Sequence, residues 1–314
     1  MTPQRTKERH TVRSTGYPRL LAFVTSLSVT PIQPEGLSRN RTVGSRVIKD
    51  ASLSFTPTSV RPGAPALSRV AVISANETPW GGSEELWQRA ALALASRGLR
   101  VDVYKARLPL DIAPVARLRD AGCRLHDLAR PLGLPMRLFG HISFLSRPFA
   151  LLLLMTRLTL GLLLRRPDFV ILSQGGNWDG LHFGSLLLRL KIPFVLVSQK
   201  ATEFYWPPDH LSDRVLKLYQ GCVHAYFVSE HNKRLTEVQL GEALRSASVV
   251  RNPFLVFYDA VPGPLPPGDT VDLACVGRIY PMEKGQDLLI QLLAKEKWRN
   301  RPITRSEEHT SELQ

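Results

Sequence analysis

Cysteine is scarce in this chain, and its spacing excludes a disulfide or metal framework. The three cysteines, Cys123, Cys222 and Cys275, include no pair with the C-x-x-C spacing of zinc and redox sites. Each lies in or near a strand-like apolar run, which is typical of small core residues in a reducing compartment. We therefore expect a cytoplasmic protein without a dedicated metal site.

Uninterrupted apolar runs are also short. The longest mainly apolar segment extends from Phe149 to Leu164, and Arg157 interrupts it. Arg147 and Arg165 flank the segment. It falls short of the roughly 18 residues that predict a membrane span. A helix packed in the core is the favoured interpretation, and a basic surface in peripheral contact with anionic lipid is the alternative.

The first 68 residues lack the apolar content of a folded domain. Through Arg69 there are eleven Lys and Arg against three Asp and Glu, a surplus of eight within the net charge of +14. We expect residues 1–68 to be a disordered or non-native extension, because Pro, Ser, Thr and Gly interrupt every apolar run. A targeting segment is the alternative, since Leu20–Val29 imitates a signal sequence. Charge confined to such a tail is weak evidence for nucleic-acid binding, and no nucleic-acid partner is expected.

The last ten residues, 305–314, are polar and aperiodic, and they look like one reading frame of a sequencing-library adapter. We expect the natural sequence to end near Thr304, with a genuine polar tail as the alternative. A second domain that starts at residue 270 would then be cut off after a strand, a helix and the beginning of another strand. The Pro- and Gly-rich segment 258–269 is predicted to link it to a first domain at 69–257.

Between residues 69 and 250, strand-like runs alternate with helical patterns, which predicts a doubly wound parallel sheet. The predicted strands are Arg69–Ser74, Arg100–Lys105, Cys123–Leu128, Phe169–Ser173, Pro193–Gln199, Ala225–Ser229 and Ala247–Val250. The predicted helices are Ser83–Arg97, Pro114–Ala121, His141–Arg165, Gly180–Leu190, His210–Gly221 and Asn232–Leu240. In such sheets ligands bind outside the carboxyl ends of the strands, so residues that directly follow strands are the candidates for a site.

A glycine pair follows the first predicted strand. The loop 75–80 leads into Gly81-Gly82-Ser83 and then into an apolar-periodic helix. Paired glycines allow the backbone to approach a ligand closely, and Ser83 is predicted to cap the helix.

Two cations follow the strand that opens the second domain. Val271–Val276 runs into Gly277-Arg278, and Lys284-Gly285 comes six residues after the arginine, ahead of another apolar helix. Arginine offers a planar fork, lysine a mobile charge and the helix end unpaired N–H groups, a set that suits a diphosphate. A common Gly-Arg turn and a solvated Lys-Gly form the alternative.

Together these two segments resemble the retaining sugar-nucleotide transferases of glycosyltransferase family 4, over residues 69–303. The resemblance implies the GT-B fold, with two Rossmann-like domains, of which the second is truncated here. It implies transfer of a sugar from a nucleotide diphosphate sugar to the hydroxyl of a glycan or lipid-linked acceptor, with retention and without a cofactor. Arg278 and Lys284 would bind the donor diphosphate, and Gly81, Gly82 and Ser83 would form a phosphate or substrate loop.

Four other residues are candidates for acceptor or sugar contacts. Asn177 and Asp179 follow the strand Phe169–Ser173, where the family often has a histidine that this chain lacks; a turn with Asp179 as a helix cap is the alternative. Glu203 stands beside three aromatics that could bind sugar or pack the loop. Asn252 matches the point where the family enters its interdomain link, or is a plain turn residue. No catalytic residue is identified.

Two other classes of protein remain as alternatives. A dinucleotide-dependent oxidoreductase is disfavoured because the first loop lacks G-x-G-x-x-G and the second strand ends in Tyr104-Lys105, without an acid for the ribose. A non-catalytic nucleotide-sugar or glycan-binding protein is harder to separate, since the family's paired glutamates would lie beyond Thr304. Because the second domain is expected to be truncated, the 314-residue chain itself is expected to be inactive.

Overall fold

The structure, a computed structural model, describes residues 67–78, 80–129, 143–253, 270–277 and 279–308. The chain divides into two compact units, Met1–Phe257 and Tyr258–Gln314. The predicted extension at 1–68 lies almost entirely outside the described residues, and the linker at 258–269 lies wholly outside them.

Unit 1 is built on a seven-stranded sheet in which every neighbouring pair is parallel. The strand order is β3-β2-β1-β4-β5-β6-β7, in which the direction of winding reverses between β1 and β4. This order contains the 3-2-1-4-5-6 arrangement of dinucleotide-binding folds. The strands are β1 (Arg69–Ser74), β2 (Arg100–Lys105), β3 (Arg124–Asp127), β4 (Phe169–Gln174), β5 (Phe194–Ser198), β6 (His224–Phe227) and β7 (Ala247–Val249).

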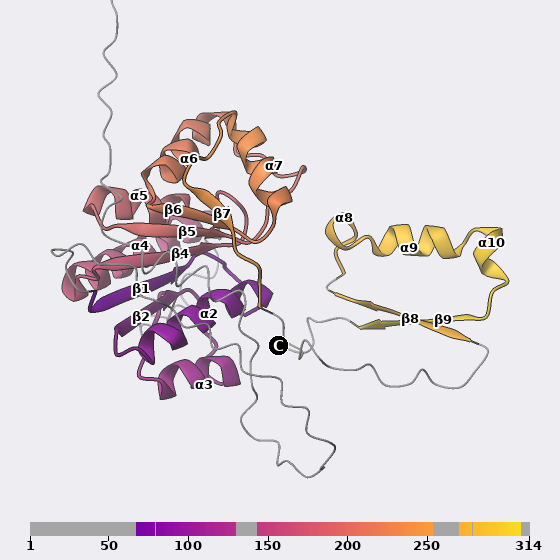
Figure 1. Ribbon diagram of the computed structural model, residues 1–314, viewed down its shortest axis with the longest axis horizontal. Helices are drawn as coiled ribbons and strands as arrows, with labels where there is room; N and C mark the ends of the chain where they lie inside the picture. The colour runs from indigo at the N-terminus through magenta and orange to yellow at the C-terminus, as the bar shows by residue number, and fades with distance from the viewer. Residues whose placement is uncertain (1–66, 79, 130–142, 254–269, 278, 309–314) are drawn as a thin grey trace, which may run out of the picture. The chain divides into compact units, whose positions relative to one another are not determined.

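Helices cover both faces of this sheet (Figure 1). They are α2 (Gly82–Ala95), α3 (Ala113–Asp120), α4 (Ser143–Arg165), α5 (Leu181–Leu190), α6 (Asp209–Gly221) and α7 (Glu230–Leu240). On β1, Val70 and Val72 join the core beneath α2 and α3, while Ala71 and Ile73 join the core beneath α4, α5 and α6. The predicted fold class, a doubly wound parallel α/β sheet, is therefore confirmed.

Helix α4 corrects one expectation about apolar length. Its 18-residue window Pro148–Arg165 is long and apolar enough to cross a membrane by length and composition. Only 11% of this window is buried, so the favoured interpretation as a helix packed in the core is correct for one side of the helix only. The buried positions include Leu158 and Leu162, which pack against the sheet. Because α4 connects β3 to β4, two parallel strands of one sheet, it is a crossover helix of the fold.

Unit 2 opens with a parallel β–α–β arrangement. Strand β8 (Val271–Val276) pairs with β9 (Ile303–Glu308), and helices α8 (Pro281–Lys284), α9 (Gln286–Leu293) and α10 (Glu296–Arg299) lie between them in the chain. Strand β9 continues past Thr304 into the segment expected to be an adapter-derived tail, whose origin stays a prediction. Helix α9 leaves much of its apolar surface uncovered: Leu288, Ile290 and Leu292 are exposed, and Leu289 and Leu293 are half-buried.

Candidate functional site

The carboxyl ends of β1 and β4 meet at the point where the sheet reverses its winding. The amide of Ala75 donates to the carbonyl oxygen of Ser173 at 2.8 Å, which holds the first residue after β1 beside the end of β4. A Cβ on Gly175 would lie 4.0 Å from the Asn76 side chain, so the loops after both strands are neighbours. This is the position at which doubly wound sheets bind their ligands.

The glycine pair forms the start of α2 at this edge. Gly81 is the N-cap, with extended backbone, and no side chain caps the helix. The expectation that Ser83 caps α2 is therefore wrong: Ser83 lies inside the first turn, and its hydroxyl bonds to side chains instead. A Cβ at Gly82 would meet no atom within 4 Å, so the space beside Gly82 is open to a ligand.

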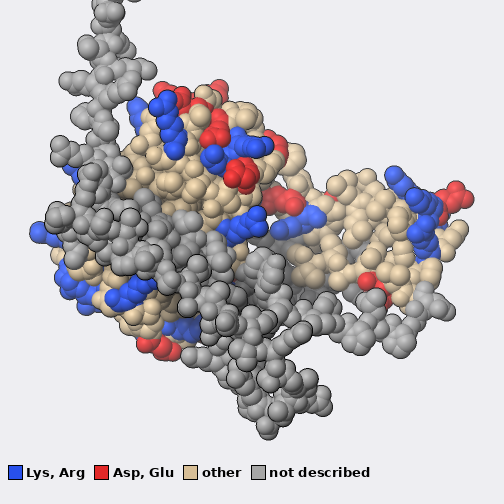
Figure 2. All heavy atoms as spheres, viewed as in Figure 1, with Lys and Arg blue, Asp and Glu red and all other residues tan. Residues whose placement is uncertain are grey.

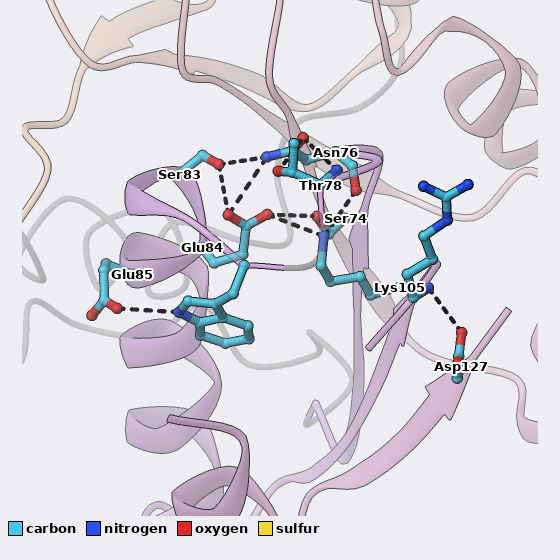
Figure 3. Close-up of polar contacts among 10 residues, drawn as sticks. Ser74, Asn76, Thr78, Ser83, Glu84, Glu85, Lys105 and Asp127 are labelled. Atoms are coloured by element: carbon cyan, nitrogen blue, oxygen red, sulfur yellow. Dashed lines mark hydrogen bonds and ion pairs between the residues drawn. The ribbon is translucent and has the colours of Figure 1, made fainter. Parts of the chain in front are cut away.

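A buried polar network fixes this helix start to the sheet (Figure 3). Ser83 Oγ accepts from Asn76 Nδ2 at 2.8 Å and lies 2.7 Å from Glu84 Oε2. On the other side of that carboxylate, Lys105 Nζ lies 3.2 Å from Glu84 Oε1 and donates to the carbonyl oxygen of Asn76 at 2.8 Å. Ser74 Oγ contacts the same Oε1 atom at 3.4 Å. The loop before the glycine pair is thus tied to β1, to β2 and to α2.

Burial dominates the ionisation of Lys105. Both Lys105 and Glu84 have no exposed surface. Desolvation lowers the pKa of Lys105, while the Glu84 carboxylate acts in the opposite direction. Lys105 ends β2, where dinucleotide-binding folds place the acid that holds a ribose. A buried cation already paired with Glu84 cannot take that role, which weighs against the oxidoreductase alternative.

The predicted residues after β4 differ in accessibility. Asn177 is only 4% exposed, and its amide donates to Thr236 and Gln239 of α7 at 2.9 and 2.6 Å. Asp179 accepts from the amide of Gly176 and so closes the turn after β4. The alternative in which Asp179 caps the next helix is wrong, because the N-cap of α5 is Gly180 and no side chain caps it. Asn177 would have to leave its partners to contact a ligand, whereas Asp179 is exposed at the turn.

The loop after β5 presents an exposed acid with three aromatic side chains. Glu203 Oε1 lies 3.1 Å from His231 Nε2 of α7, and both side chains are largely exposed. Trp206 donates from its indole nitrogen to the Glu203 carbonyl oxygen at 3.0 Å, which closes the loop locally. The aromatic residues Phe204, Tyr205 and Trp206 are 44–59% exposed, so they do not pack into the core. Aromatic faces beside a carboxylate can contact sugar rings and hydroxyl groups.

Two further residues of unit 1, Asn252 and Ser229, follow strands β7 and β6. Asn252 follows β7 and is exposed. Ser229, which follows β6, caps α7 by accepting from the amide of Asn232 at 3.1 Å. Within the part of the chain that is described, no cluster of three His, Cys, Asp or Glu side chains could hold a metal ion.

In unit 2, the glycine after β8 and the second cation lie together. A Cβ at Gly277 would be 3.7 Å from Lys284 Cδ, so the exposed lysine side chain lies along the end of the strand. Gly285 has a positive φ of 68°, which ends α8 and starts α9 directly behind Lys284. Arg278 lies outside the described residues. Lys284 therefore lies at the carboxyl end of β8, in front of α9, and its role in binding a diphosphate stays a prediction.

Four residues of the network at the helix start were not predicted from sequence: Ser74, Asn76, Glu84 and Lys105. For two of them the sequence position indicates that the charged side chain is buried. Lys105 ends an alternating apolar run, and Glu84 stands in the first turn of an apolar helix, both at positions that burial requires to be paired.

Comparisons with known proteins concern the architecture only. No protein-family model matches the chain, and no curated protein is significantly similar to it. Among solved structures, it is similar to a glycosyltransferase from Rickettsia africae, at 12% identity and a TM-score of 0.46, over 78% of this chain and 69% of that one. It is also similar to Anabaena HepE in complex with UDP (11%, TM-score 0.47, 76% and 69%) and to MurG of Acinetobacter baumannii (13%, TM-score 0.40, 77% and 66%). At these values the likeness assigns no function, and the chain stands as a doubly wound α/β protein of the Rossmann type.

Proposed function

We propose that this protein is a glycosyltransferase of the GT-B type that moves a sugar from a nucleotide diphosphate sugar to an acceptor hydroxyl. Retention at the anomeric carbon, as in glycosyltransferase family 4, is part of the proposal and follows from the resemblance of the two glycine-containing segments. The observation that carries it is the placement of Lys284 along Gly277 at the carboxyl end of β8, in front of α9.

The chemistry that this placement supplies is charge stabilisation. When the bond between the sugar and the diphosphate breaks, negative charge builds up on the departing phosphate. A fixed ammonium group stabilises that charge more in the transition state than in the ground state, and loss of one such donor costs about a hundredfold or more in rate. Lys284 is assigned this role, with Arg278 as its expected partner from the sequence. No cofactor takes part in this scheme.

The edge of unit 1 is assigned to substrate. The open space beside Gly82 and the glycine turn closed by Asp179 lie at the winding reversal of the sheet. Glu203 and the three aromatics after it extend this edge toward a glycan or lipid-linked acceptor. The free thiols of Cys123, Cys222 and Cys275 support a cytoplasmic location, where nucleotide sugars would be the donors.

Titration calorimetry with nucleoside diphosphates tests the proposal. UDP is the first probe, because the similar Anabaena protein is described in complex with it, and GDP and ADP follow. We expect Lys284→Ala to weaken binding about tenfold or more, and Lys295→Ala, an equally exposed lysine of unit 2, to leave it unchanged. Absence of binding to every nucleoside diphosphate, or equal binding by Lys284→Ala, would overturn the proposal.

A second measurement separates the enzyme from a non-catalytic binding protein. Because the 314-residue chain itself is expected to be inactive, the measurement uses a version with a completed second domain. Release of nucleoside diphosphate from a nucleotide sugar, followed with and without candidate acceptors, is expected of that version if the protein is the enzyme. Binding without any release would favour the non-catalytic alternative.

A further inference from the structure

One side of α4 is apolar although it faces away from the sheet. Phe149, Leu152, Leu160, Leu163 and Leu164 are 64, 63, 54, 51 and 81% exposed. Leu158 and Leu162 on the opposite side of the helix are buried in the core. A surface helix of a water-soluble domain normally places polar residues on its outer side. Helix α4 is instead apolar on both sides, and none of the described residues of unit 1 covers its outer stripe.

A groove runs beside this stripe, between α4 and its neighbours α5 and α6. It has a volume of about 450 Å³, with Leu152 and Leu160 of α4 on one wall. Arg189 of α5 and Arg214 of α6 line the other wall. Both arginines are exposed, and neither forms an ion pair among the described residues. The surface therefore combines an apolar stripe with two available guanidinium groups at its border.

The charged side chains of α4 and its neighbour α5 have one sign. Helices α4 and α5 contain no Asp or Glu, and each ends with an arginine in its last turn. Acidic side chains of unit 1, mixed with Lys and Arg, are visible over α6 and α7 (Figure 2). Two copies of the chain that met through this surface would bring like charges together. An anionic partner with an apolar interior matches both features of the surface.

We propose that the α4 face, defined as the five exposed apolar residues of α4 with Arg189 and Arg214, binds the surface of an anionic lipid bilayer. The apolar side chains enter the boundary between headgroups and acyl chains, and the guanidinium groups bond to lipid phosphates. The proposal goes beyond the sugar-transfer function and does not depend on it. It also does not make α4 a membrane span, because the helix stays in place as a crossover of the sheet.

Co-sedimentation with vesicles tests this surface in the full chain. The vesicles contain phosphatidylcholine alone or phosphatidylcholine mixed with phosphatidylglycerol. The double variant Leu160→Gln/Leu163→Gln should lower the partition coefficient on the mixed vesicles about tenfold or more. Replacement of Arg189 or Arg214 by Gln should lower it about fivefold each, and mainly on anionic vesicles. Val238→Gln on α7, whose side chain is 64% exposed, is the matched control and should bind as the parent does.

The basic residues 1–68 are present in every variant, so their attraction to anionic lipid is common to all of them. A direct readout comes from Leu160→Trp, whose added fluorescence should be quenched by brominated phosphatidylcholine, while that of Val238→Trp should not. Unchanged binding by Leu160→Gln/Leu163→Gln, or no quenching of Leu160→Trp, would overturn the proposal. So would ultracentrifugation that shows a dimer of the parent chain and a monomer of the double variant, because the α4 face would then be a self-association surface.

Discussion

Lys105 Nζ lies 3.2 Å from Glu84 Oε1, and neither side chain has any exposed surface. The pair joins the end of β2 to the first turn of α2, and through Asn76 it also holds the loop that precedes the glycine pair. A buried ion pair contributes little net stability compared with apolar residues, but removal of one partner leaves the other charge uncompensated.

Lys105→Met should therefore destabilise unit 1 by about 3–5 kcal/mol, measured as the free energy of unfolding in urea. The double variant Lys105→Met/Glu84→Gln should recover much of that loss, because no buried charge remains. If the single and double variants are equally unstable, the pair is not what holds the helix start. Lys200→Met, which changes a lysine that is only half-buried in a loop, serves as the control.

Gly161→Ala should destabilise the contact between α4 and the sheet. A Cβ at this position would lie 2.8 Å from Tyr104 Cε1, and the Tyr104 ring is stacked on His126 with centroids 4.6 Å apart. The overlap should cost about 1–3 kcal/mol and outweigh the usual gain of alanine over glycine in a helix. Thermal unfolding measures the effect. Gly82→Ala, where the added methyl meets open space, should melt as the parent does, and a matching loss there would contradict this explanation.

Asp168 should make the stability of unit 1 dependent on acid pH. Partial burial raises the pKa of Asp168, but hydrogen bonds from the amides of Ser68 and Arg69 and from the Ser68 hydroxyl outweigh it and lower the pKa below its ordinary value. The contribution is therefore complete above the unfolded value of about 3.9 and is lost as the pH falls through the lower folded value.

Asp168→Asn should thus cost about 1 kcal/mol near neutral pH and less as the pH falls below the folded pKa. Urea unfolding at a series of pH values measures this difference. Asp111→Asn, at an exposed position, should show no such trend. A constant difference between Asp168→Asn and the parent at all pH values would contradict the assignment.

The three cysteines should differ in reactivity. Cys123 and Cys222 are buried, and burial raises the pKa of Cys123 to about 11 and that of Cys222 to about 12, so little thiolate forms. Cys275 on β8 is half-buried. A disulfide reagent at mildly alkaline pH should modify Cys275 first in the native protein and the other two only after denaturation. Cys275→Ser should remove the fast phase, and a fast phase that survives would show that a core thiol is accessible.

Much of the fold was predictable because the strands are continuous apolar runs. Strands β1 and β2 match the predicted bounds, β4 is one residue longer at its carboxyl end, and β5 is one residue shorter at each end. The meeting of the loops after β1 and β4 also follows from the rule for parallel sheets. What failed depends on side-chain direction: Ser83 was expected to cap the helix and instead joins a network with Asn76.

The pairing of Glu84 with Lys105 could not be predicted from a local pattern, since it joins helix α2 to the end of strand β2. The inward direction of Asn177 depends on α7, which comes more than fifty residues later in the chain. The favoured interpretation of α4 as a helix packed in the core is wrong for its outer side, for a different reason. The sequence of a helix that is apolar on all sides is typical of a helix buried in the core. Only the positions of the neighbouring helices and strands show which side of α4 stays uncovered.

Helix α4 is also long for a crossover. Its 23 residues extend about 35 Å, whereas the six residues of β4 extend about 20 Å. Since α4 ends only a few residues before β4 begins, most of the excess projects beyond the carboxyl edge of the sheet, the edge that holds Gly82 and Asp179. A bilayer bound along α4 would then border the entrance to that edge, so a lipid-linked acceptor could reach it by diffusing in two dimensions without leaving the membrane.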